Sequence, residues 1–319
     1  MSRNKYLIGL SIILSFILVW SSSCKKKKEF KDEDCQDLVD CQASRAENDV
    51  AISDVNYLIM ERPLLHGRNE ATDGYWSGTK LCGASLDSSQ ISEGIFRLVY
   101  DGTVCNNRKR EGIIMVSILA YPLKKWKNQG CVLNIQYFAY KVTNLNSGRS
   151  VQFDGTQSIT NESGGTWYDL KYLHKPGIVH STRASDLKVS FNGGDYGIYN
   201  MSRRATYSMT DTVVNCKLEG TGSDGNNSDI ESWGLTRNGI AFTSRVTSSI
   251  LWSSACGIHS PTNGALLVKV DGKPFDLNAS LGTDSNGNSF SGGAGNCSYG
   301  FRVNWAYKRK SLTRVFPYN

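Results

Sequence analysis

The sequence predicts an all-β protein, with an antiparallel β-sandwich-like body preceded by a short N-terminal helical segment. Three observations lead to this class. After Pro63 the apolar residues alternate with polar ones, which is the pattern of half-buried antiparallel strands. Thirty-one glycines against six prolines supply many tight turns. Eight cysteines follow residue 24, and an even number in an exported chain indicates disulfides.

The first 23 residues have the order of a secretory signal peptide. Arg3 and Lys5 form a positive start, residues 6–20 carry no charge, and three serines follow. Fifteen residues are short for a membrane-spanning helix, which needs about 20.

Cys24 directly after the serines resembles a bacterial lipobox, although Ser21 stands where that pattern usually has an aliphatic residue. The resemblance implies that Cys24 becomes the mature N-terminus and carries the acyl chains, palmitate among them. Two or three such chains anchor a protein without a spanning helix. The alternative is an uncleaved short anchor, with Lys25 to Lys28 as its stop-transfer flank.

Residues 24–34 are then a charged tether between the membrane and the fold. Lys25 is not the aspartate that typically retains lipoproteins in the inner membrane. We therefore expect a lipid-anchored protein of the outer membrane in a Gram-negative bacterium, facing either the periplasm or the cell surface.

Residues 35–63 have a helical pattern, because apolar residues recur at intervals of three and four up to Pro63. The β-rich body of residues 64–319 follows. Its clearest strands are DLKVSFN (186–192), FDLNASL (275–281) and FRVNWAY (301–307), separated by turns such as FNGG and VDGK. Ten or more strands are enough for two packed sheets.

Two segments hint at a duplicated module. RKREGIIMV (108–116) and GLTRNGIAF (234–242) both place Arg-x-Gly before an apolar strand. The body is therefore either one unit or two, with a boundary somewhere within 160–200.

The body also carries YDGTVC, REGI and a late GAGNC element. With the acylated cysteine and the helical lead, these motifs resemble uncharacterised surface lipoproteins of Bacteroidota. That resemblance implies location and fold. It implies no activity.

The charge pattern argues against nucleic acid as a partner. The formal net charge is +7, but the signal and the tether lysines account for much of it, and residues 35–319 carry about +4. This is an ordinary surface and not a phosphate-binding stripe.

We expect Cys82 to pair with Cys105 and Cys256 with Cys297. Eight thiols allow 105 connectivities, so sequence alone does not settle the pairing. No close C-x₂-C pair exists for zinc, the Asp/Asn-rich loops lack calcium-loop spacing, and no cofactor motif is present. We therefore expect neither a metal site nor a cofactor.

Candidate ligand-binding residues are the aromatics of two glycine-rich stretches, DGYWSG and GGTWYDL: Tyr75, Trp76, Trp167 and Tyr168. Exposed aromatics of this kind stack on ligands. Thr212, in DTV, matches the D-S/T-aliphatic pattern of Bacteroidota O-glycosylation and is a candidate glycan site.

No catalytic signature appears, so the sequence favours a non-enzymatic binding or adhesion module at the envelope. The ligand would be a glycan or a protein. The alternative is a glycan-binding or glycan-hydrolysing surface lipoprotein, since the ~5–10 Å carboxylate pair of a glycosidase is invisible in sequence. The oligomeric state stays open.

Overall fold

The computed structural model describes residues 36–61, 81, 83–105, 107–257, 260–290, 297–307 and 310–318. Residues 37–319 form one compact unit. The signal, Cys24 and the tether lie outside the described residues. The all-β class, with a helix ahead of the sheet, is confirmed.

The helical lead is one long helix, α2, over Gln36–Glu61. The strands that follow are β1 (Ala84–Asp87), β2 (Ile95–Cys105), β3 (Arg108–Ile118), β4 (Cys131–Asn144), β5 (Ser150–Asn161), β6 (Ile178–Phe191), β7 (Tyr196–Thr210), β8 (Val213–Gly220), β9 (Ile230–Leu235), β10 (Ala241–Ser253), β11 (Asn263–Val270), β12 (Leu277–Thr283), β13 (Gly300–Tyr307) and β14 (Lys310–Pro317). Two short helices interrupt them, η2 (Ile91–Glu93) and α4 (Trp167–Lys171).

All these strands belong to one 14-stranded sheet, in which neighbours in sequence are neighbours in space. The only departure among the described strands is β9, which pairs with both β7 and β10. Every strand pairing is antiparallel, as the alternating pattern and the short turns require. β5 ends at Asn161, β6 lies within 160–200, and the two strands pair with each other. A boundary between two modules in this range stays a prediction.

The sheet bends along a line of β-bulges. Register shifts occur at Glu111/Ile113 in β3, Tyr137/Tyr140 in β4, Asp154/Gln157 in β5 and Ala184/Leu187 in β6. A bulge adds a residue to one strand and increases its local bend and twist. Bulges on successive strands therefore bend this sheet, and strands numerous enough for two packed sheets form a single one.

Gly112 shows why this line needs particular residues. Its φ is +101°, and a Cβ at this position would lie 2.3 Å from the carbonyl oxygen of Ala139 on the neighbouring strand. Only glycine combines this backbone angle with so close an approach. The bulge in β3, and not a turn, is the feature that requires glycine at this position.

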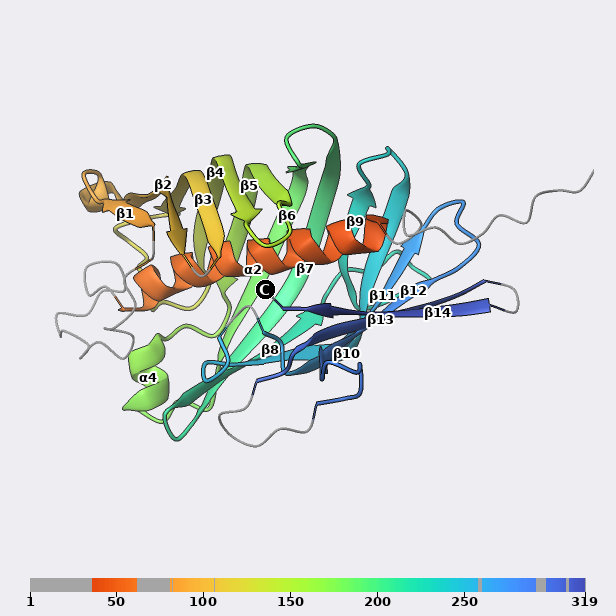
Figure 1. Ribbon diagram of the computed structural model, residues 1–319. Helices are drawn as coiled ribbons and strands as arrows, with labels where there is room; N and C mark the ends of the chain where they lie inside the picture. The colour runs from red at the N-terminus through yellow and green to blue at the C-terminus, as the bar shows by residue number, and fades with distance from the viewer. Residues whose placement is uncertain are drawn as a thin grey trace, which may run out of the picture. The chain divides into compact units, whose positions relative to one another are not determined.

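α2 crosses the inner face of the sheet (Figure 1). Its apolar residues Val50, Ala51, Val55, Leu58 and Ile59 are at most 2% exposed. Side chains of β3, β4 and β5 hydrogen-bond to α2, and residues of β10, β13 and β14 line a cavity beside it. The two halves of the sheet thus face each other with the helix between them.

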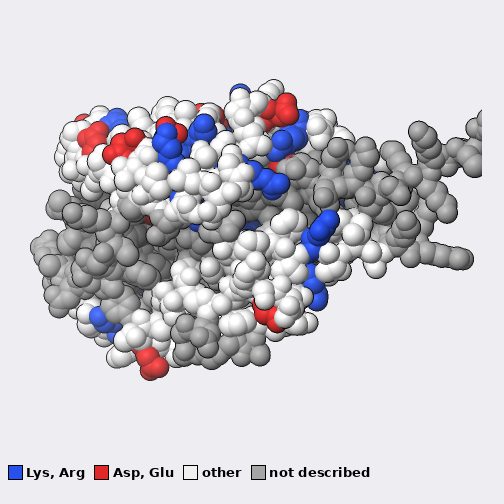
Figure 2. All heavy atoms as spheres, viewed as in Figure 1, with Lys and Arg blue, Asp and Glu red and all other residues white. Residues whose placement is uncertain are grey.

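Charge is distributed unevenly over one face of this unit. Figure 2 shows Lys and Arg interspersed with Asp and Glu along the upper edge of this face, and fewer charged side chains among the described residues below it. This surface pattern is separate from the charges buried around α2.

Candidate functional site: the cleft beside helix α2

α2 is held by arginines of the strands and of one turn. Four of its carboxylates form ion pairs with them. The pairs, with their N–O distances, are Asp40–Arg237 (2.6 Å), Glu47–Arg108 (2.9 Å), Asp49–Arg203 (3.0 Å) and Asp54–Arg110 (2.9 Å). Buried charges are tolerated only when they are paired and hydrogen-bonded. The helix therefore has one position relative to these strands.

Sequence reasoning missed this set, although one signal was available. Asp40, Glu47 and Asp54 are spaced by seven residues. Seven residues are almost two helical turns, so the three carboxylates lie along one face of α2. The four arginines come from β3, from β7 and from the turn between β9 and β10, and nothing in the sequence pairs them with the helix.

The centre of the arrangement is a four-residue charge cluster. Arg203 contacts Asp49 at 3.0 Å and Glu231 at 2.6 Å, and Arg45 contacts Asp49 at 3.0 Å. Two positive and two negative charges balance, and none of the four side chains is more than 7% exposed. Burial raises the pKa of the Asp49 carboxyl, and Arg203 and Arg45 oppose that rise.

A cavity of about 350 Å³ opens beside the first half of α2, and we call it the mouth cavity. One wall is α2, and a second is formed by the ends of β3, β4 and β5. The third wall is aromatic and comes from the C-terminal strands: Trp252, Phe301, Phe316 and Tyr318. Phe301 stacks on Phe316, with ring centroids 5.2 Å apart, and on Tyr318 at 6.0 Å.

The mouth cavity also has polar groups available to a ligand. Glu47 Oε1 accepts a hydrogen bond from Arg108 Nε at 2.9 Å. Its other oxygen, Oε2, is buried and has no hydrogen-bond partner among the described residues. Arg149 is exposed at the edge of the cavity. Arg45, in contrast, is committed to Gln42 and Asp49.

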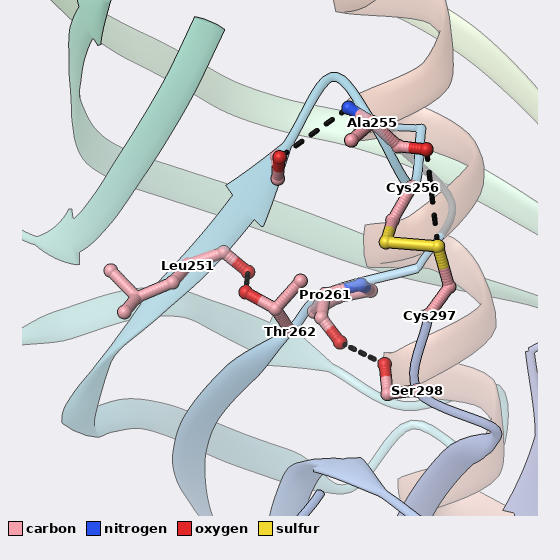
Figure 3. Close-up of a disulfide and its surroundings, with 8 residues drawn as sticks. Leu251, Ala255, Cys256, Pro261, Thr262, Cys297 and Ser298 are labelled. Carbon is pink, nitrogen blue, oxygen red and sulfur yellow. Dashed lines mark hydrogen bonds between the residues drawn. A yellow bond between two sulfur atoms is a disulfide. The ribbon is translucent and has the colours of Figure 1, made fainter. Parts of the chain in front are cut away.

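A disulfide near the end of β10 confirms one predicted pairing. Cys256 and Cys297 are bonded, with 5.4 Å between their Cα atoms (Figure 3). Ser298 Oγ donates to the carbonyl oxygen of Pro261 at 2.8 Å in the same corner. Because Pro261 lines the cavity, the disulfide constrains a loop that forms part of the cavity edge.

The other cysteines have different settings. Cys105 is disulfide-bonded, and Cys82, its predicted partner, lies outside the described residues. Cys131 and Cys216 are buried thiols. Burial raises the pKa of the Cys131 thiol to about 11, which keeps it protonated and unreactive at neutral pH.

The predicted ligand-binding aromatics that lie within the described residues are more buried than expected. Trp167 is only 8% exposed at the start of α4, with its ring 5.2 Å from that of Tyr207. It lines a second, smaller cavity and does not face solvent. Tyr168 is half-buried against Tyr172. Tyr75 and Trp76 lie outside the described residues.

The candidate glycan site is accessible in the structure. Thr212 lies exposed in the turn between β7 and β8. Its modification stays a prediction.

Among the described residues, no cluster of three or more His, Cys, Asp or Glu side chains has the arrangement of a metal site. No helix in this part of the chain is long and apolar enough to cross a membrane.

Comparison with protein-family models, with curated proteins and with solved structures found no match to this chain. The case for function therefore depends on the cleft itself.

Proposed function

We propose that this protein is a lipid-anchored envelope protein that binds a ligand, without catalysing a reaction, in the mouth cavity beside α2. The observation that carries the proposal is the cavity itself. Its volume of about 350 Å³ falls in the range of small-ligand sites, ~300–1,000 Å³. Its aromatic wall and few polar groups are also typical of such sites.

The polar groups favour a ligand with hydrogen-bond donors and an apolar face. Glu47 Oε2 is an acceptor only, so it needs a hydroxyl or an amine. The rings of Phe316, Phe301 and Tyr318 offer apolar surface on the opposite side. A segment of a protein partner with a basic or hydroxylated residue has this chemistry.

A glycan has the same chemistry, and this favours the second candidate function. Sugars present hydroxyls to carboxylates and their C–H faces to aromatic rings. Hydrolysis would need one of Glu47 and Asp49 to act as an acid, and both are engaged by arginines. Glycan binding is therefore the better-supported form of this alternative.

An array of glycans and host-matrix proteins, probed with the full chain, tests the proposal. Arg149→Ala at the edge of the cavity should weaken binding to the array hit at least several-fold. Arg183→Ala removes the same exposed side chain type from the outer part of β6, away from the cavity. It should leave binding unchanged. Equal loss in both variants, or loss in neither, would contradict the mouth cavity as the site.

The anchor has its own test. We expect labelled palmitate to be incorporated into the wild-type protein and not into Cys24→Ala. Mass spectrometry of the native protein should show residues 1–23 removed. An intact signal with an unmodified thiol would refute lipid anchoring while leaving the cavity to be tested separately.

A further inference from the structure

The smaller cavity lies beside the second half of α2, and we call it the inner cavity. Its volume is about 110 Å³. α2 contributes Asn56, the sheet contributes His180, Tyr207 and Trp252, and α4 contributes Trp167. Asp49 and Trp252 also line the mouth cavity, so the two cavities meet at these residues.

The inner cavity is surrounded by polar atoms that have no partner. Neither ring nitrogen of His180, which is 1% exposed, is hydrogen-bonded within the described part of the chain. The same is true of Trp252 Nε1 and Asn56 Oδ1, whereas Asn56 Nδ2 donates to Tyr207 Oη at 3.2 Å. Buried polar groups are nearly always satisfied by protein, water or ligand. Several unsatisfied atoms around one cavity indicate a molecule that belongs there.

These groups are uncharged at neutral pH. Burial lowers the pKa of His180 to about 3, so its ring offers one donor and one acceptor. The charged residues of the wall, Asp49 and Arg203, are paired with each other. A charged ligand in this cavity would lose its hydration and find no free opposite charge, so its binding would be unfavourable.

We propose that the inner cavity binds a small, neutral, planar group with both a hydrogen-bond donor and an acceptor, such as an azole ring or a carboxamide. Trp252 Nε1–H meets the acceptor of this group, and Asn56 Oδ1 meets its donor. The rings of Trp167 and Tyr207, T-shaped at 5.2 Å, provide the aromatic walls. The size agrees, since an apolar cavity of ~150 Å³ holds benzene, and a five-membered ring is smaller.

Pyrazole is a suitable probe because it is neutral, planar, and carries one donor and one acceptor. The full chain in detergent would be titrated with pyrazole while the indole N–H signals are followed by NMR. The signal lost in Trp252→Phe identifies Trp252. We expect that signal to shift saturably with pyrazole, and not with benzene or with guanidinium.

Matched variants locate the site. Followed on the indole N–H signal of Trp167, which also lines the cavity, pyrazole binding should be roughly 2- to 10-fold weaker in Trp252→Phe, the range for one net hydrogen bond. His180→Phe, which removes both ring nitrogens and fills space, should weaken it more than 10-fold. Trp305 is an equally buried tryptophan on β13 whose Nε1 also has no partner among the described residues. Trp305→Phe, outside the cavity, should leave binding unchanged.

The proposal is overturned if pyrazole gives no saturable shift, because the cavity then holds water only. It is also overturned if benzene binds as tightly as pyrazole. These wild-type titrations decide the matter even if a variant fails to fold. Arg149→Ala should not alter pyrazole binding, so failure of the inner site and failure of the mouth cavity are distinguishable.

Discussion

At the scale of single residues, His180 has an environment that makes stability depend on pH. It is buried next to Trp126 and Tyr207, whose rings lie 4.9 and 5.1 Å from its own. The titratable and charged groups sharing its cavity are Asp49, Arg203, Tyr207 and Cys216. None of them is an unpaired anion that could compensate a protonated imidazole.

We therefore predict acid destabilisation centred on His180. Its pKa is about 3 in the folded protein and about 6.5 in the unfolded chain. Because the folded-state pKa is depressed, the contribution is present above pH 6.5 and is lost as pH falls towards 3. By linkage the loss is about 2 kcal/mol between pH 7.5 and 5. Urea unfolding across this range measures it.

His180→Phe should remove that pH dependence, and His174→Asn, in an exposed turn, should keep it. The buried Asp49 and Asp54 change stability with pH in the opposite direction. Burial raises their pKa values, so the folded state binds protons before the unfolded chain does as pH falls. The comparison with His180→Phe isolates the histidine. An identical pH profile in this variant would contradict the assignment.

The adjacent arginines Arg203 and Arg204 allow a second prediction. Arg203 is 3% exposed between Asp49 and Glu231, whereas Arg204 is 48% exposed beside Glu162 at 3.3 Å. Breaking a buried pair leaves uncompensated charges, so Arg203→Gln should cost about 3–5 kcal/mol of unfolding free energy. Arg204→Gln should cost at most ~1 kcal/mol. Denaturant unfolding of both variants at pH 7 tests this, and similar values would refute a structural role for the charge cluster.

At the scale of elements, the helix and the strands were predictable to different degrees. α2 over 36–61 agrees with the predicted lead of 35–63, because its apolar spacing and Pro63 are local signals. The nearly continuous apolar run IIMVSILAY, 113–121, predicts a strand buried on both faces. β3 instead ends at Ile118 and alternates, with Ile114 and Val116 buried and Ile113 and Met115 only partly covered.

The β-bulges predict that two glycines of β2 and β3 differ in how well they tolerate replacement by alanine. Gly102 and Gly112 have similar positive φ values, +90° and +101°. A Cβ at Gly102 would meet side chains only among its nearest atoms, the end of Lys109 at 3.0 Å and Glu111 at 3.5 Å, whereas at Gly112 it would meet backbone at 2.3 Å. Gly102→Ala should cost about 1–2 kcal/mol from backbone strain. Gly112→Ala should cost ~3–5 kcal/mol, because overpacking against a neighbouring strand is added.

Thermal and denaturant unfolding of the two glycine variants measure this difference. A smaller cost at Gly112 than at Gly102 would mean that the bend in the sheet does not depend on the bulge in β3.

At the scale of the whole molecule, the C-terminal strands complete the cleft, and a disulfide closes their connection. Cys256 and Cys297 are 41 residues apart. Closing a loop of this length with a disulfide lowers the entropy of the unfolded chain. The relation between loop length and chain entropy gives roughly 4 kcal/mol of stabilisation. The bond also joins the loop after β10 to the segment before β13, so it bears on both stability and the edge of the mouth cavity.

We expect the double variant Cys256→Ala, Cys297→Ala to lose about 2–4 kcal/mol of unfolding free energy. It should also bind the array hit more weakly, since Pro261 and its neighbours are less constrained. Cys131→Ala, which removes a buried thiol that forms no disulfide, is the control for loss of a cysteine. Unchanged stability in the double variant would show that the bond is dispensable.

The sequence by itself determined the local features: the alternating strands, the turns, the helix and the residue types able to form disulfides. These depend on neighbours a few positions apart, and period and turn chemistry report them directly. The tertiary structure alone decided that one sheet would bend around α2 and bring Glu47, Asp49, His180 and Trp252 to two meeting cavities. Those contacts join residues up to two hundred positions apart. The ion pairs that specify them consist of common charged residues, and only the folded arrangement of the strands shows which arginine meets which carboxylate.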